Sequence, residues 1–161
     1  LAKIEWRNSL HQMYAHASEK NEIMQNKQTI YIFGNPLLDF DNLPVQLAPE
    51  LAKVMPEINF VVMDPNENLY PKNKELMIID TALGIDKIKI LEDIDKIELS
   101  PQYSLHDHDL GFNLKLLKKL GKLDKVKIFC VPPNMNKKQA LDGLVRLIIK
   151  KMTPRYFSEE K

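Results

Sequence analysis

Thr29-Ile30-Tyr31-Ile32-Phe33 runs directly into Gly34-Asn35-Pro36. β-Branched and aromatic residues favour a β-strand, and Gly-Asn-Pro favours a turn. Leu43, Leu47 and Leu51 then recur at helical spacing. A strand, a loop and a helix in this order are the first part of a βαβ unit, so we expect an α/β fold.

The same alternation continues along the chain. Further apolar runs occupy residues 58–63, 76–79, 88–91 and 126–131. Two more helices are predicted: one has a leucine face and ends at Gly121, and the other covers residues 140–152 and is capped by Asn136. The leucine face consists of Leu110, Leu114, Leu117 and Leu120. The strands are apolar throughout, which is typical of parallel strands covered on both faces. We therefore predict a three-layer α/β domain, in which a mostly parallel, twisted sheet of about five strands has helices on both faces. Residues 88–91 and 95–99 are candidates for an antiparallel edge.

The first 27 residues differ from the rest in composition. They are polar, contain neither Gly nor Pro, and place Ile4, Leu10, Met13 and Ala17 at loosely helical spacing. We predict that residues 1–27 are a helical N-terminal extension or the remnant of a fusion, and that such a helix offers a contact to a partner. The α/β domain is then expected over residues 28–153, with a C-terminal tail over 154–161.

The composition is typical of a soluble, globular protein. Hydrophobic residues make up 44% of the 161 residues and charged residues 28%. Cys130 is the single cysteine and the N-terminus has no signal-peptide pattern, so we expect a cytoplasmic location. No apolar run approaches the ~18 residues that span a bilayer, so no membrane insertion is expected. The net charge is only +1 and arginines are few, which argues against a nucleic-acid partner.

Acidic residues follow several of the predicted strands. Asp39 and Asp41 come after the first strand, Asp64 after the second and Asp80 after the third, while His106-Asp107-His108-Asp109 leads into the next helix. In an open α/β sheet the carboxyl ends of the strands form one rim, where ligands bind. Two carboxylates and one imidazole suit nickel, zinc or a similar divalent ion. Alternatively, the aspartates cap helices and strand ends, and the histidines are surface residues.

Other chemistries lack their motifs. Gly34-Asn35-Pro36 is not a glycine-rich phosphate loop, so no bound nucleotide or dinucleotide cofactor is expected. Ser104 lies near His106, but no oxyanion-type glycine motif accompanies it, which argues against a serine hydrolase. Cys130 lies inside an apolar run and is expected to be a buried, inert thiol.

Three segments resemble the [NiFe]-hydrogenase maturation endopeptidases. Gly34-Asn35-Pro36-Leu37-Leu38-Asp39-Phe40-Asp41 resembles the family's first motif, in which an acidic metal ligand follows the Asn after six residues; here that position is Asp41. Leu76-Met77-Ile78-Ile79-Asp80-Thr81-Ala82 resembles the strand that ends in the second ligand, Asp80. Ser104-Leu105-His106-Asp107-His108-Asp109-Leu110-Gly111 resembles the stretch that supplies a histidine, closest to an archaeal-type subgroup; it selects His106, with His108 as the alternative.

This resemblance covers residues 29–149 and implies a function. Family members remove a short C-terminal peptide from the precursor of the hydrogenase large subunit, and nickel already loaded in that precursor is the recognition element. Asp41, Asp80 and His106 would be both metal ligands and catalytic residues, with nickel supplied by the substrate and zinc or a similar ion as a substitute. The loop Asp64-Pro65-Asn66-Glu67 departs from the family's Asp-Gly-Gly-Thr turn, and Asn42 replaces a common glycine. The alternative function is a non-catalytic α/β module that recognises a metalloprotein precursor without cutting it.

Overall fold

A single five-stranded sheet organises the chain. The computed structural model describes residues 27–64, 67–99 and 107–152. The strands are β1 (Gln28–Ile32), β2 (Ile58–Val62), β3 (Glu75–Thr81), β4 (Lys89–Leu91) and β5 (Lys125–Val131). The helices are α2 (Leu43–Val54), α3 (Asp107–Lys119), α4 (Lys137–Met152) and the 3-10 helix η1 (Ile94–Leu99). The strand order is β2-β1-β3-β5-β4, and every pairing is parallel except that of β4 with β5.

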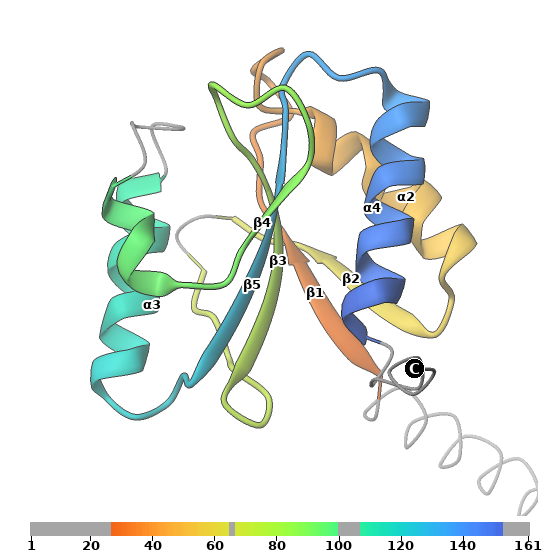
Figure 1. The fold of residues 1–161 in the computed structure, drawn as a ribbon. Coiled ribbons are helices and arrows are strands. Elements are labelled where there is room, and N and C mark those ends of the chain that lie inside the picture. The colour runs from red at the N-terminus through yellow and green to blue at the C-terminus, as the bar shows by residue number, and fades with distance from the viewer. Residues whose placement is uncertain (1–26, 65–66, 100–106, 153–161) are drawn as a thin grey trace, which may run out of the picture.

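Helices cover both faces of this sheet, as predicted. Helices α2 and α4 pack together on one face, and α3 and η1 contact each other on the other face (Figure 1). The result is a three-layer α/β architecture with a mixed, mostly parallel sheet. Residues 1–26 and 154–161 lie outside the described residues, so the predicted N-terminal extension and C-terminal tail stay predictions.

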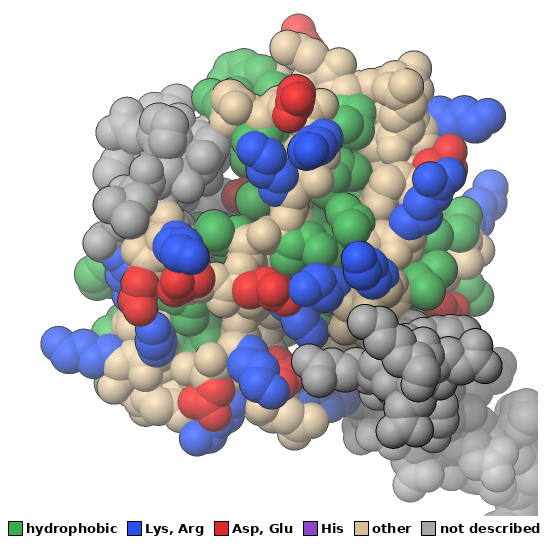
Figure 2. All heavy atoms as spheres, viewed as in Figure 1, with side chains coloured by type: hydrophobic (Ala, Val, Ile, Leu, Met, Phe, Trp, Pro, Cys, Tyr) green, Lys and Arg blue, Asp and Glu red, His purple; other side chains and the backbone are tan. Residues whose placement is uncertain are grey.

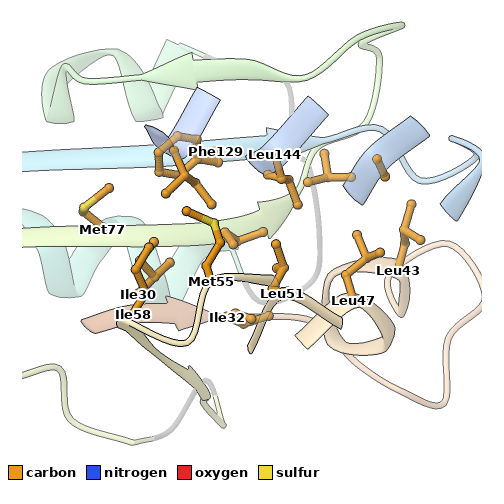
Figure 3. Packing of buried hydrophobic residues seen from close by; sticks show 14 residues of the cluster. Ile30, Ile32, Leu43, Leu47, Leu51, Met55, Ile58, Met77, Phe129 and Leu144 are labelled. Atoms are coloured by element: carbon orange, nitrogen blue, oxygen red, sulfur yellow. The ribbon is translucent and has the colours of Figure 1, made fainter. Parts of the chain in front are cut away.

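Successive residues of the central strand β3 enter different cores. Met77 and Ile79 belong to the cluster that contains the buried leucines of α2 and α4, whereas Leu76 and Ile78 belong to the cluster under α3. Figure 3 shows the first cluster, in which the leucines of α2 point toward the sheet. Side chains on a strand alternate between faces, so a strand covered on both sides has to be apolar at nearly every position.

Two helix ends have the capping that the sequence predicts. The Asn136 side chain accepts hydrogen bonds from the amides of Lys138 (2.9 Å) and Gln139 (3.3 Å) at the start of α4, which confirms the predicted cap. Helix α3 ends in a Schellman motif, in which Gly121 has a φ of 67° and the amide of Lys122 donates to the carbonyl of Leu117. This motif confirms the predicted end of the leucine-faced helix.

The prediction of an antiparallel edge is right for one of its two candidate segments. Strand β4 is that edge, whereas residues 95–99 are wrong as a strand because they lie in the 3-10 helix η1. Ile94 and Ile97 are three residues apart, which matches the three-residue turn of a 3-10 helix. Ile94 is buried in the cluster under α3, and Asp95 forms an ion pair of 2.9 Å with Lys118 of that helix. The Lys118 ammonium lowers the pKa of the Asp95 carboxyl.

The surface reflects the near balance of charges in the sequence. On the face shown in Figure 2, lysine and arginine side chains lie among acidic ones. Among the described residues, no helix is both long enough and apolar enough to cross a lipid bilayer.

Candidate functional site

The loop between β1 and α2 consists of two consecutive β-turns. The amide of Leu38 donates to the carbonyl of Asn35 at 3.1 Å, and the amide of Asp41 donates to the carbonyl of Leu38 at 2.9 Å. The Asn35 side chain also accepts a hydrogen bond from the amide of Leu37 at 2.9 Å. The loop is therefore held by its own hydrogen bonds.

Asp41 closes this loop back onto its first residues. The Asn35 amide donates to both the carbonyl oxygen and the Oδ2 atom of Asp41, each at 3.0 Å. Gly34 has a φ of 149°, and a Cβ atom there would stand 2.6 Å from the Asp41 carbonyl oxygen. Asp41 is only 2% exposed, so its carboxylate is fixed at the carboxyl end of β1 rather than extended into solvent.

Asp80 lies on the neighbouring strand at the same edge. It is the penultimate residue of β3, and its Oδ1 atom accepts the amide of Thr81 at 2.8 Å. The pairing of Ile32 with Ile79, continued by the hydrogen bond from the Phe33 amide to the Ile79 carbonyl, sets Asp80 beside Phe33. Asp41 and Asp80 thus come from the carboxyl ends of adjacent strands. The chain leaves β1 toward β2 on one side and reaches β3 on the other, so this edge includes the topological switch point of the sheet.

On the face of the sheet under α3, side chains become partly exposed toward the carboxyl ends of the strands. On β3, Leu76 and Ile78 are 2% and 0% exposed, but Asp80 is partly exposed. On β5, Val126 and Ile128 are buried, but Cys130, which pairs with Asp80 in register, is partly exposed. The prediction of a buried Cys130 is therefore wrong, because burial under α3 does not extend to the last row of the sheet.

Helix α3 begins at the same edge. A short connection, residues 120–124, joins its end to the start of β5, so the two elements run in opposite directions. The thirteen residues of α3 span about 20 Å and the seven of β5 about 23 Å, which returns the start of α3 to the carboxyl ends of the strands (Figure 1). His108 belongs to the first turn of this helix. His106, the preferred histidine of the sequence analysis, lies outside the described residues.

The remaining predicted acids are placed differently. Asp39 is exposed in the second β-turn. Asp64, which follows β2, is exposed, and its amide donates to Glu67 at 3.4 Å. The structure therefore distinguishes Asp41, which is buried and held by the Asn35 amide, from its exposed neighbour Asp39.

Two residues that sequence reasoning missed also shape the site. Asn35 fixes Asp41 through its backbone amide, an interaction that no side-chain pattern reveals. Thr81 is 3% exposed, and its Oγ1 atom is buried without a hydrogen-bond partner among the described residues. Side chains alternate along a strand, so Asp80 and Thr81, the last two residues of β3, place a carboxylate on one face of the sheet and a hydroxyl on the other.

These donors fit a divalent ion only in part. Carboxylate oxygens are ordinary ligands of zinc and of similar ions. Within the described ranges, however, no three His, Cys, Asp or Glu side chains form a group that could hold a metal ion. The described part of the rim therefore supplies two carboxylates at most, and a metal bound there needs further ligands from elsewhere.

The comparisons with known proteins support the fold. The chain is similar in structure to the hydrogenase maturating endopeptidase HybD from E. coli, with a TM-score of 0.58 and 17% identity, over 78% of this chain and 94% of that one. A second match is an uncharacterized protein from Wolinella succinogenes, with a TM-score of 0.44 and 16% identity, over 78% of this chain and 94% of that one. No protein-family model matches the sequence, and no curated protein matches it either. The fold described above is thus also the fold of a hydrogenase maturating endopeptidase.

Proposed function

We propose that this protein is a metal-dependent processing endopeptidase, which removes a C-terminal peptide from the nickel-loaded precursor of a [NiFe]-hydrogenase large subunit in the cytoplasm. The observation that supports this most strongly is the arrangement of Asp41 and Asp80. Asp41 closes the loop that follows β1, and Asp80 is the penultimate residue of the adjacent strand β3. Both therefore lie at the switch point of the sheet, where ligands of open α/β folds bind. The structural likeness to a hydrogenase maturating endopeptidase supports the same reaction.

The two aspartates would hold the precursor's metal through carboxylates that are already oriented. Asp41 accepts the Asn35 amide and Asp80 accepts the Thr81 amide, so one oxygen atom of each is fixed by the backbone. Such hydrogen bonds hold a ligating carboxylate in place and lower the cost of ordering it when the metal arrives. His106 is the proposed third ligand, and His108 is the alternative.

The partial donor set suits a metal that arrives with its own ligands. Two carboxylates and one imidazole leave coordination positions open for the ligands of the precursor. Bound there, the metal would polarise the scissile carbonyl or activate a water molecule. The protein's own residues would hold and orient the metal.

The test is an intact-mass measurement on the purified nickel-loaded precursor, before and after incubation with the protein. We expect the loss of one discrete C-terminal peptide, and no loss from the same precursor prepared without nickel. A stable complex on gel filtration without any change in mass would favour the non-catalytic precursor-binding module instead. If the protein neither cleaves the precursor nor forms a complex with it, both functions are contradicted.

A further inference from the structure

Two apolar side chains are exposed in the loop that carries Asp41. Leu37 is 88% exposed and Phe40 is 43% exposed. They occupy the same position in the two consecutive β-turns: Leu37 is the third residue of the turn from Asn35 to Leu38, and Phe40 is the third residue of the turn from Leu38 to Asp41. Turn positions of this kind usually hold Gly, Asn, Asp or Ser.

The loop holds the backbone of both residues in place. Leu37 is held by the hydrogen bond from its amide to the Asn35 side chain. Phe40 directly precedes Asp41, whose amide, carbonyl and carboxylate all take part in the hydrogen bonds that close the loop. A partner that covers these side chains therefore does not have to order the backbone of the loop that carries them.

Folding gives no reason for these residue types. Neither side chain belongs to the two buried clusters. Leu37 and the exposed part of Phe40 forgo the free energy that burial provides. Single exposed apolar residues are common on protein surfaces. Here, however, there are two, at equivalent positions of adjacent turns, and the second is bonded in sequence to a proposed metal ligand.

We propose that Leu37 and Phe40 are specificity-determining residues, which bind an apolar segment of the precursor next to the scissile bond. This inference rests on the proposed function. The contact would place the precursor over Asp41 and would contribute to the affinity for the substrate, not to the chemical step. Since both residues sit on the same hydrogen-bonded loop as Asp41, docking of the precursor and positioning of its metal would be coupled through a single rigid element.

The experiment compares Leu37→Ser, Phe40→Ser and the double variant with the unmutated protein, and uses Leu120→Ser as the matched control. Leu120 is 58% exposed and lies at the end of α3, at the opposite edge of the sheet. We expect each loop variant to raise KM for the nickel-loaded precursor about tenfold, with kcat nearly unchanged. Thermal unfolding should be unaltered by Leu37→Ser, because that side chain is almost fully exposed. Binding of the precursor, measured by titration calorimetry, should weaken by the same factor, and the control should leave both quantities unchanged.

The outcomes separate the docking proposal from the proposed function. If the unmutated protein cleaves the precursor and the loop variants have the same KM, the docking proposal is wrong while the proposed function stands. If the unmutated protein binds without cleaving, the calorimetric titration alone decides the docking proposal. If the loop variants change only the oligomeric state of the free protein on gel filtration, the two side chains contact a second copy of this chain, which overturns the proposal. If the unmutated protein neither binds nor cleaves the precursor, both the docking proposal and the proposed function are contradicted.

Discussion

Gly34 lies so close to the backbone of Asp41 that the absence of a side chain at Gly34 determines where Asp41 can lie. The backbone at Gly34 has a φ of 149°, a value that residues other than glycine rarely adopt. A Cβ atom added there would lie only 2.6 Å from the carbonyl oxygen of Asp41. The Asn35 amide then binds the same carbonyl and the carboxylate. The glycine is therefore required for the position of the acid, and not only for the shape of the turn.

We expect Gly34→Ala to destabilise the protein by about 1–3 kcal/mol and to reduce cleavage, because the new methyl group displaces Asp41. Gly84→Ala is the control: its φ is also positive, at 72°, but no atom lies within 4 Å of the added Cβ. It should cost about 1–2 kcal/mol and leave cleavage per folded molecule unchanged. The measurements are chemical denaturation and the cleavage rate. Equal effects of both substitutions would show that the contact with Asp41 has no consequence.

Helix α3 begins at the rim formed by the carboxyl ends of the strands and buries its leucines in the core on that face of the sheet. Its residue Leu114 is fully buried, in one cluster with Leu110, Leu123 and residues of the strands that α3 covers. Leu120, six residues further along, is 58% exposed. The predicted leucine face is thus confirmed for Leu110, Leu114 and Leu117, the last of which is partly buried against the same cluster. Leu120 projects into solvent, where the Schellman motif ends the helix.

Leu114→Ala should lower the free energy of unfolding by about 2–5 kcal/mol, since it leaves a cavity between α3 and the sheet. Leu120→Ala should change it by no more than about 0.5 kcal/mol. At a temperature where both variants are folded, the cleavage rate of each should match that of the unmutated protein. If denaturation curves of the two variants coincide, Leu114 does not have the packing described here.

Elements with a clear periodicity were predictable from the sequence, and those without one were not. The runs at 29–33 and 126–131 have strong β-formers, and both are strands. Residues 95–99 have apolar side chains that suit either a short strand or a 3-10 turn, so local preference did not decide between them. Cys130 has the sequence environment of a core residue, but its exposure depends on how far α3 extends over the sheet, which is a property of the tertiary structure.

At the scale of the molecule, the strand order brings the two proposed ligands to neighbouring strand ends. Asp41 and Asp80 are 39 positions apart in the sequence and come to adjacent strand ends because β1 lies between β2 and β3. The sequence predicted this common rim through the general rule for open α/β sheets. It did not predict the Asn35 amide or the two exposed apolar residues, since backbone hydrogen bonds and turn positions carry no side-chain signature. The placement of His106 stays a prediction.

The most direct test of the central claim is the rate at which the nickel-loaded precursor loses its C-terminal peptide with Asp41→Asn and Asp80→Asn. Asparagine keeps an oxygen for the backbone amide but removes the charge that a metal needs, so we expect each variant to be slower by on the order of 100-fold or more while folding normally. Asp124→Asn is the control, because Asp124 immediately precedes β5 at the opposite edge of the sheet, and it should cleave at the unmutated rate. Cleavage by Asp41→Asn and Asp80→Asn at the rate of Asp124→Asn would contradict the assignment of this rim as the active site.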